Sequence, residues 1–356
     1  MSIAFITRDF TGQFPYLTPG GCAYYRCALP LSVAGQRGYL GLPAWDPIRG
    51  FGIKEAVGTG LFGFQTVVLK LIMDRSTPRQ VELAQQLGQY IIVDIDDYYE
   101  GLTPANKAYE ATHPDSNKWS NRDNYERVIE RADMLTVSTP FLLEHYTGKH
   151  PNVQMVRNGV NLWMFDRGKK PSRKPVIGWV GAINYRNNDL EQLREWLPDY
   201  LEEHDLRFHH AGHAKDAPSF ASITGVDPNR VTTSPLVPLP HYPSGFNFDV
   251  GIVPLNDIPF NHAKSNIKGL EYVASGIPFV SSDLPEYRIL HESGVGQLAT
   301  TPLEWKQALT PLLDRSHRQR TARREWDTVS QYWSVEARAQ EWQRVFAISE
   351  SSSRTR

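Results

Sequence analysis

The stretch Asn266–Val280 reads NIKGLEYVASGIPFV and holds the parts of a helix-to-strand connection in order. An amphipathic segment comes first, a Gly-Ile-Pro at residues 276–278 interrupts it, and an apolar run follows. Glycine and proline at this place are typical of a helix end, and a short apolar run after them predicts a buried strand. The stretch therefore predicts one helix–strand unit of an α/β fold, with Glu271 on its helix.

Outward from this stretch, short apolar runs alternate with helical patterns along the whole chain. The runs cover residues 3–7, 66–72, 90–96, 134–139 and 153–156, and then 176–182, 206–212, 230–237, 248–255 and 278–282. They are continuous rather than alternating, which is typical of parallel strands that are covered on both faces. The predicted fold class is α/β, with two Rossmann-like, doubly wound parallel-sheet domains.

A basic segment, DRGKKPSRKP at residues 166–175, separates the two sets of runs. It contains two prolines and no apolar periodicity, which is typical of a linker, although a nuclear-localisation or phosphate-binding patch is the alternative interpretation. A chain of 356 residues is also longer than one hydrophobic core usually serves. We therefore predict an N-terminal domain over residues 1–168 and a C-terminal domain over residues 169–332.

Composition excludes several classes of protein. The net charge of −1 gives no overall basic field, so binding to bulk nucleic acid or to an anionic membrane is not favoured. Cys22 and Cys27 are the only cysteines, which argues against a disulfide scaffold and suits a reducing compartment. The first apolar run is too short for a signal peptide, and no run reaches the length of a membrane span. We expect a cytoplasmic protein without a transmembrane segment.

The opening stretch carries a polar face. A helix over residues 264–274 would place Lys264, Lys268 and Glu271 on one side, at spacings of four and three residues. Two ammonium groups suit a diphosphate, and a carboxylate suits the vicinal hydroxyls of a ribose. From spacing alone, however, a surface ion pair between Lys268 and Glu271 is the simpler interpretation.

The start of the same predicted helix adds hydrogen-bond donors. The first backbone N–H groups of a helix have no carbonyl partner within it, and here they belong to Ser265, Asn266 and Ile267. Such N–H groups favour phosphate, both as donors and through the helix dipole. Phosphate at the helix start and sugar hydroxyls at Glu271 would together describe one end of a nucleotide sugar.

Residues 264–287, KSNIKGLEYVASGIPFVSSDLPEY, resemble the matching region of GT-B glycosyltransferases, especially the family 4-like retaining enzymes. The resemblance implies that Glu271 binds the ribose of the donor, with Gly276 and Pro278 in the matching turn. It also implies two domains facing across a cleft, a final helix near residues 333–350 that returns to the first domain, and transfer with retention and without a required metal. The family often has a second Glu where this chain has Ala263, so the resemblance does not assign the donor sugar.

Two further regions resemble the same family. Residues 176–193 are similar to the first strand and glycine turn of its C-terminal domain, which implies that Gly181 approaches the donor and that Arg186 faces its diphosphate. The alternative for Arg186 is an exposed loop arginine, and Ala182 stands where the first basic residue of the family's usual pair would be. Residues 131–165 are similar to the last strand and helix of the N-terminal domain and the turn that follows them.

The first strand is followed by a glycine pair, Gly20 and Gly21, and by a predicted helix. Glycines let a backbone approach a ligand closely, and the resemblance implies that this loop faces the donor phosphates and the acceptor. Arg26, on that helix, would add a cation. The alternative is that the two glycines only form a tight turn.

A second acidic motif follows the strand at residues 90–96, where Asp94, Asp96 and Asp97 come close together. An Asp-x-Asp at a strand end can bind Mg²⁺ or Mn²⁺ with a diphosphate, as in metal-dependent GT-A glycosyltransferases. In a GT-B protein the same carboxylates would line the acceptor side, with Asp96 as a candidate catalytic base. Both interpretations remain open from the sequence.

The function predicted is transfer of a sugar from a nucleoside-diphosphate sugar to a hydroxyl acceptor. The predicted catalytic residues are Asp96, Arg186 and Lys264. The predicted donor-binding residues are Gly20, Gly21, Gly181, Arg186, Lys264, Ser265, Asn266, Lys268 and Glu271, and no metal or other cofactor is expected.

The alternatives are a GT-A-like metal-dependent transferase using Asp94 and Asp96, a nucleotide-sugar epimerase or phosphorylase, and a non-catalytic sugar-nucleotide binder. Three histidines, His209, His210 and His213, are predicted to be structural. The donor base, the sugar and the acceptor (protein, glycan, lipid or modified nucleobase) are not assigned.

Overall fold

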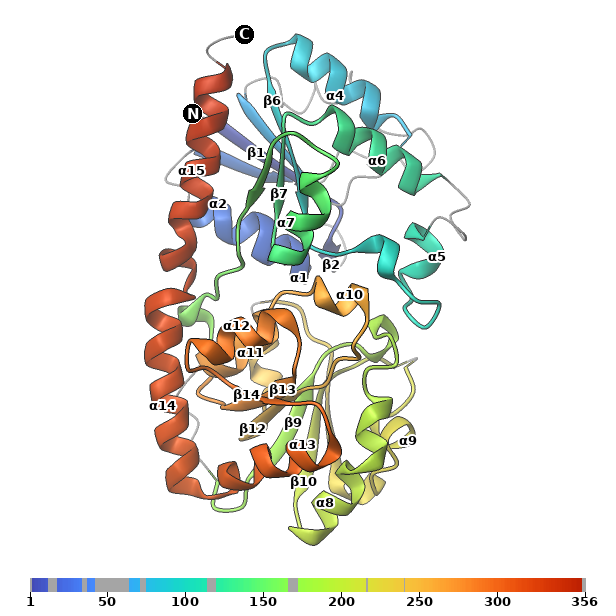
Figure 1. Cartoon of the computed structure of the whole chain (residues 1–356), viewed down its shortest axis with the longest axis vertical. Coiled ribbons are helices and arrows are strands. Elements are labelled where there is room, and N and C mark those ends of the chain that lie inside the picture. Colours follow the sequence, from blue (N-terminus) through green and yellow to red (C-terminus); the bar gives the residue numbers. More distant parts are fainter. Residues whose placement is uncertain are drawn as a thin grey trace. The chain divides into compact units, whose positions relative to one another are not determined.

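The structure, a computed structural model, describes residues 2–11, 18–33, 37–41, 64–70, 75–113, 120–165, 172–215, 217–239 and 241–353. The chain divides into two compact units (Figure 1). Unit 1 comprises Met1–Glu100, Glu110–Gly159 and Val335–Arg356, and unit 2 comprises Gly101–Tyr109 and Val160–Ser334. The division falls before the predicted linker, of which residues 166–171 lie outside the described part, and residues 101–109 group with unit 2.

Unit 1 contains a parallel sheet that has, in the described part of the chain, six strands in the order β4-β1-β5-β6-β7-β8. The strands are β1 (Ser2–Thr7), β4 (Arg37–Gly41), β5 (Thr66–Lys70), β6 (Tyr90–Ile95), β7 (Met134–Val137) and β8 (Val153–Met155). Every residue of β6 is buried, which explains its continuous apolar sequence. A short antiparallel pair, β2 (Phe10–Thr11) with β3 (Thr18–Pro19), follows β1.

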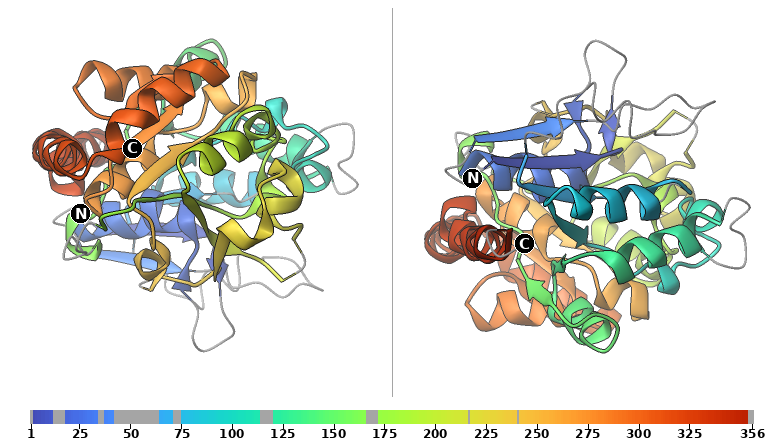
Figure 2. Two further views of the ribbon diagram at one scale, coloured as in Figure 1. Left: turned by 90° about the horizontal axis from the view of Figure 1, so that it is seen from below. Right: turned by 90° about the horizontal axis from the view of Figure 1, so that it is seen from above.

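Helices cover both faces of the unit 1 sheet (Figure 2). They are the continuous helical segment α1 (Gly21–Ala23), η1 (Tyr24–Ala28) and α2 (Leu29–Val33), then α4 (Thr77–Gln86), α6 (Asn121–Arg131), α7 (Pro140–Thr147) and α15 (Val335–Ser353). The short helix α5 (Tyr109–Thr112) lies apart from the sheet (Figure 1). The last of these, α15, packs on the sheet through Trp342 and Phe346, whose ring centroids lie 5.7 and 6.2 Å from that of Phe5. The C-terminal helix thus belongs to the core of unit 1.

Unit 2 repeats the architecture, with a described parallel sheet of six strands in the order β11-β10-β9-β12-β13-β14. The strands are β9 (Val176–Val180), β10 (Arg207–His213), β11 (Val231–Pro235), β12 (Val250–Val253), β13 (Phe279–Ser282) and β14 (Gln297–Ala299). The α-helices are α8 (Leu197–Glu203), α9 (Phe220–Thr224), α10 (Pro259–His262), α11 (Ile267–Ala274), α12 (Pro285–Glu292), α13 (Pro302–Leu309) and α14 (Arg315–Tyr332). Two doubly wound parallel sheets confirm the predicted fold class.

Helix α11 lies unusually close to its sheet because two glycines face aromatic rings. A Cβ on Gly269 would come within 2.6 Å of Phe279, and one on Gly251 within 2.4 Å of Tyr272. The Tyr272 hydroxyl accepts from the Val180 N–H at 3.0 Å, so it fixes the helix to the neighbouring strand. This packing holds the side chains of α11 on a rigid support.

Within the described residues, no helix combines the length and the apolar character that crossing a membrane requires.

Candidate functional site

Helix α11 is shorter than the sequence predicts. It begins at Ile267, because the preceding residues form the separate short helix α10, and the Lys264 N–H bonds to the Asn261 carbonyl of that helix. The prediction that Lys264 shares a helical face with Glu271 is therefore wrong. Lys264 lies in the loop between the helices, with its ammonium 4.3 Å from the Phe260 ring centroid.

The shorter helix also changes which backbone groups point out of its start. The first N–H groups of α11 are those of Ile267, Lys268 and Gly269, rather than those predicted from Ser265 onward. Asn266 is the N-cap residue, is buried, and donates its side-chain N–H to the Glu286 carbonyl at 3.3 Å. Asn266 thus joins α11 to the start of α12, and Ser265 is half-buried beside it.

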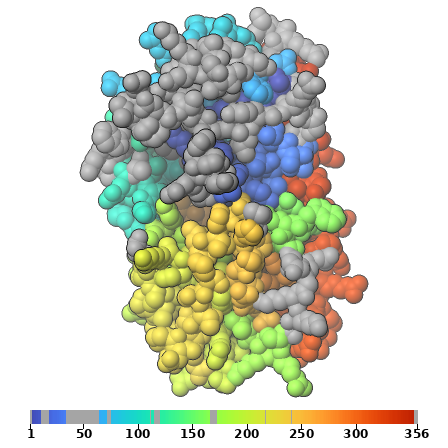
Figure 3. Space-filling view, turned by 180° about the vertical axis from the view of Figure 1, so that it is seen from behind, coloured from blue at the N-terminus to red at the C-terminus, as the bar shows by residue number. Residues whose placement is uncertain are grey.

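Glu271 is buried, with only 5% of its surface exposed, and does not point into bulk solvent. Its Oε2 accepts a hydrogen bond of 3.0 Å from the Tyr242 hydroxyl. Burial, and next the charge of Glu271, raise the pKa of Tyr242, so this hydroxyl keeps its proton and acts as the donor. Tyr242 comes from the short helix η9 (Tyr242–Gly245), in the segment between β11 and β12 that forms part of the surface of unit 2 (yellow to orange in Figure 3).

Two cations lie over one buried tryptophan near Glu271. The Lys268 ammonium is 5.7 Å, and the Arg186 guanidinium 5.5 Å, from the ring centroid of Trp179. Lys268 donates a hydrogen bond to the Val180 carbonyl, so it is not the surface partner of Glu271 that spacing alone would suggest. Burial, and next the charge of Arg186, lower the pKa of Lys268 to about 7.

Arg186 is half-buried rather than an exposed loop arginine, and its Nε is buried without a hydrogen-bond partner in the described structure. A cation pair of this kind raises the local positive potential, and an anion between the two charges would relieve their repulsion. Arg186 and Lys268 were each predicted to face a diphosphate, and as a pair of neighbouring cations they suit such an anion better than either does alone.

Gly181 sits where no other residue fits. Its φ of +151° is disfavoured for side chains, and a Cβ would come within 2.8 Å of Trp179 and 3.0 Å of an Arg186 nitrogen. The turn at Gly181 is held by His210, whose Nε2 donates to the Gly181 carbonyl at 3.0 Å and whose ring stacks on Trp179. Burial lowers the pKa of His210 to about 4, so its ring is neutral and serves the structure of this turn.

Of the glycine pair of unit 1, Gly20 lies against the side chain of Asp9. A Cβ on Gly20 would come within 1.9 Å of Asp9 Oδ1, whereas one on Gly21 would meet nothing within 4 Å. The other carboxylate oxygen of Asp9 accepts the Ala23 N–H at 2.8 Å. The helix start for which the sequence suggested phosphate is thus already occupied by a carboxylate.

Arg26 is completely buried and cannot act as the predicted ligand cation. Its guanidinium forms a bidentate pair with Asp94, with a shortest contact of 2.6 Å, and donates to the Val156 carbonyl at 2.6 Å. Asp94 also accepts the Thr136 hydroxyl at 2.7 Å. Because these bonds engage Asp94 fully, the proposed metal site of Asp94 with Asp96 does not fit the structure.

Asp96 has a partner of its own, the buried ammonium of Lys70. Burial alone would raise the pKa of Asp96, but Lys70 lowers it below its usual range. In the described part of the chain, Cys22, Asp96 and Asp97 bring potential metal-ligating atoms within 4.8 Å of one another. Lys70 already supplies a positive charge there, so we assign no metal to this group.

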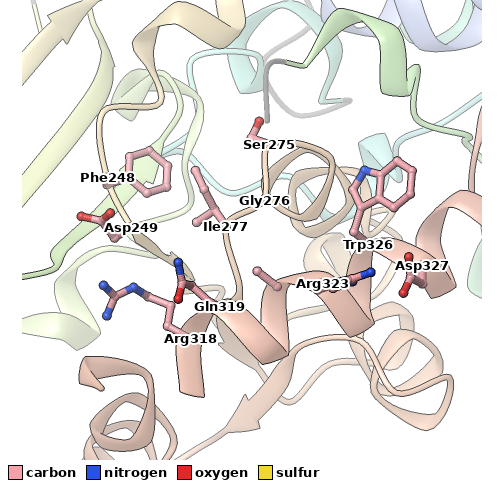
Figure 4. A pocket seen from close by; sticks show the side chains of 11 residues that line it. Phe248, Asp249, Ser275, Gly276, Ile277, Arg318, Gln319, Arg323, Trp326 and Asp327 are labelled. Atoms are coloured by element: carbon pink, nitrogen blue, oxygen red, sulfur yellow. The ribbon is translucent and has the colours of Figure 1, made fainter. Parts of the chain in front are cut away.

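A cavity of about 580 Å³ lies elsewhere in unit 2 (Figure 4). Residues 248–249 and 275–277, at the amino ends of β12 and β13, line one side of it, and α14 lines the other with side chains that include Arg323 and Trp326. Ligands of doubly wound sheets bind at the opposite, carboxyl ends of the strands. We therefore do not place the nucleotide there.

Sequence reasoning missed three residues of these clusters. Tyr242 is 29 positions from Glu271, and no local pattern joins them. Trp179 was read only as part of a buried strand, although its ring carries both cations. Asp9 gave one usable signal, an acidic residue two positions after the first strand, at the end of a sheet where ligands bind.

Comparison with known proteins fits this geometry. No protein-family model matches the chain. A protein of Bacillus subtilis (strain 168), named as the teichuronic acid biosynthesis glycosyltransferase TuaH, is 31% identical over 177 residues. The match covers 45% of this chain and 42% of that protein, so it spans less than half the length of the curated relative.

Solved structures match over nearly the whole chain. The sucrose-phosphate synthase of Thermosynechococcus elongatus has a TM-score of 0.72 at 14% identity, over 99% of this chain and 100% of that one. HepE of Anabaena, solved in complex with UDP and glucose, has a TM-score of 0.67 at 14% identity, over 98% of this chain and 100% of that one. At this level of identity the likeness shows the fold, and the chain has the GT-B fold.

Proposed function

We propose that this chain transfers a sugar from a uridine-diphosphate sugar to a hydroxyl acceptor. The observation that carries the proposal is the buried carboxylate of Glu271 on α11, with Lys268 of the same helix and Arg186 of the loop after β9 both over the ring of Trp179. A carboxylate suits the ribose hydroxyls, and the two cations suit the diphosphate. The name of TuaH supports sugar transfer, and the UDP bound to HepE supports uridine as the nucleoside.

The cations have a second role in the proposed reaction. When the bond between sugar and diphosphate breaks, negative charge develops on the leaving oxygen. Arg186, Lys268 and the nearby Lys264 stabilise that charge without reorganising, since packing already holds Arg186 and Lys268 against Trp179. This assigns catalytic roles to Arg186 and Lys264, while Gly181, Ser265 and Asn266 shape the loops around the donor.

On the acceptor side, we propose that unit 1 contributes Asp96 and its neighbours at the carboxyl edge of the sheet. The relative's name, which refers to teichuronic acid biosynthesis, supports a glycan as the acceptor. Retention at the anomeric carbon and independence from a metal are also proposed, the latter because the Arg186–Lys268 pair itself supplies positive charge for a diphosphate.

A binding and turnover experiment tests this function. We expect UDP-glucose to raise the Tm of the full chain more than the GDP-, dTDP- and ADP-sugars do, since a ligand that binds only the folded state stabilises it. We also expect slow UDP release in the presence of EDTA. Stabilisation without UDP release would indicate a non-catalytic binder, and release that needs added Mn²⁺ would favour a metal-dependent transferase.

UDP affinity is expected to depend on pH through Lys268. In the free protein its pKa of about 7 means that the ammonium loses its proton as pH rises above 7, whereas a bound diphosphate favours the charged form. The Kd for UDP should therefore rise by up to about tenfold per pH unit above 7, with proton uptake on binding. Calorimetry in two buffers of different ionisation enthalpy measures both effects.

The matched control is Lys268→Arg, because a guanidinium stays charged throughout this range. That variant should bind UDP with nearly constant affinity from about pH 7 to 9. An equal slope in both proteins would mean that another group takes up the proton.

A further inference from the structure

One short segment, Gly101–Tyr109, comes from between two parts of unit 1 in the sequence but groups with unit 2, and we call it the clasp. Local bonds shape it. Pro104 occupies the second position of a turn that the Asn106 N–H closes by donating to the Thr103 carbonyl at 3.0 Å. The Asn106 side chain in turn accepts the Ala108 N–H at 3.0 Å. The clasp therefore presents Thr103 and Asn106 from a defined turn.

The clasp binds residues 183–187, which we call the Arg186 loop. The Thr103 hydroxyl and N–H both donate to Asn187 Oδ1, at 2.8 and 3.3 Å. The Asn106 side-chain N–H donates to the Tyr185 carbonyl at 3.1 Å. These bonds hold the residues immediately before and after Arg186 in the sequence.

Two further contacts fix the same loop. The Lys107 N–H of the clasp donates to the Asn184 carbonyl at 3.0 Å. From the loop after β12, the Asn256 side-chain N–H donates to the Asn187 carbonyl at 2.8 Å. The Arg186 loop is thus held by two elements that are both far from it in sequence.

The contacts between the clasp and the loop are buried. Asn106 and Asn187 have only 3% and 4% of their surface exposed. A buried amide that loses its partner costs free energy, so the bonded arrangement is favoured over a detached one. The guanidinium of Arg186 lies 5.5 Å from the Trp179 ring centroid, and the bonds fix the backbone from which it projects.

We propose that the clasp preorganises the Arg186 loop for the donor diphosphate, with Thr103 and Asn106 as positioning residues. This role rests on the proposed transferase function, in which Arg186 faces the diphosphate. A loop that adopts its binding-competent form only part of the time binds with an affinity reduced by that fraction. The clasp keeps the loop in that form before the donor arrives, and so raises donor affinity through Arg186.

The experiment uses the full chain, with inorganic pyrophosphate and UDP as the ligands. Thr103→Val removes the hydroxyl donor at nearly constant shape, and Asn106→Ala removes the amide that reaches Tyr185. Together they should raise both Kd values about tenfold, the size expected for losing two hydrogen bonds that hold the loop. Thr103→Ser alone keeps the hydroxyl and should bind as wild type does. Calorimetric titration measures the Kd values, and circular dichroism with Tm checks folding.

Two comparisons separate positioning from a general loss of stability. In an Arg186→Gln background the same double change should raise the Kd values little further, since no guanidinium remains to be placed. The matched control is Asn229→Ala, also in unit 2, which removes an amide donor to Asp227 at 3.0 Å in an exposed turn and should change neither Kd.

Hydrogen exchange of the free protein gives a readout that does not depend on a ligand. The Arg186 N–H, which bonds to the Ile183 carbonyl at 3.0 Å within the loop, should exchange faster in the double variant. Unchanged exchange, wild-type Kd values in the double variant, or an equal loss with and without Arg186 would each overturn the role of the clasp. Wild-type protein that binds neither pyrophosphate nor UDP would instead overturn the proposed function.

Discussion

Glu271→Gln is expected to raise the Kd for UDP and UDP-glucose about 100-fold while leaving the chain folded. A hydrogen bond to a charged group contributes about 1.5–3 kcal/mol, and a factor of ten in affinity corresponds to about 1.4 kcal/mol. Removing the carboxylate charge that faces two ribose hydroxyls is therefore enough to raise the Kd about 100-fold. Glutamine keeps an oxygen for the Tyr242 hydroxyl at the 3.0 Å contact, so that hydrogen bond is preserved. Calorimetric titration with UDP measures the effect.

Inorganic pyrophosphate separates the two halves of the site. It has no ribose, so Glu271→Gln should bind it as wild type does, whereas Lys268→Gln should weaken both pyrophosphate and UDP. Glu292→Gln, at the exposed end of α12, is the matched control and should change neither affinity. Equal loss of pyrophosphate and UDP in Glu271→Gln would show that the carboxylate acts by organising the cations, and unchanged UDP affinity would remove it from the site.

Local patterns were enough to predict much of the fold. The buried strands follow from continuous apolar runs, because both faces of each sheet are covered, and the α11–β13 connection follows from its Gly-Ile-Pro. The same patterns failed at Lys264. The periodicity continues through residues 263–266, but the Lys264 N–H bonds to the Asn261 carbonyl and α10 ends there. The spacing of apolar residues does not show this.

The site could be predicted only where its residues are close in sequence. Lys268 and Glu271 share a helix, so their proximity follows from helix geometry. The proximity of Arg186 and Lys268 does not follow from helix geometry. Arg186 lies in the loop after β9, and the two cations come together only over the ring of Trp179, which belongs to β9. Asp9 and Asp96 likewise interact electrostatically only because β1 and β6 both border β5 in the sheet order.

Arg26 is a case in which the local sequence predicts a binding residue that the structure does not support. It follows a glycine pair on a helix and looks like a ligand cation, yet Asp94, 68 positions away, receives it in the core. A cation and a carboxylate that both become buried must pair, because either alone would be left without solvation. The sequence gives each charge but not the depth at which the chain places it.

Arg26→Met is expected to destabilise unit 1 by about 3–5 kcal/mol, since it leaves the buried carboxylate of Asp94 without its cation. The comparison is Arg131→Met, which breaks a pair with Glu82 of nearly the same length, 2.5 Å, but on the exposed surface. That change should cost less than about 1 kcal/mol. Urea unfolding of the full chain, with hydrogen exchange of the β1 and β6 amides to localise the loss, measures both.

The double variant Arg26→Met with Asp94→Asn decides what the loss means. If the cost of Arg26→Met comes from an unpaired buried charge, removing that charge as well should recover part of it, so the double variant should be more stable than the sum of the single changes predicts. Strict additivity would instead mean that the guanidinium stabilises unit 1 through its bond to the Val156 carbonyl and its packing on Trp342, 5.3 Å away. In either case Arg26 would serve the stability of unit 1, and the cations available to a donor diphosphate would be those of unit 2.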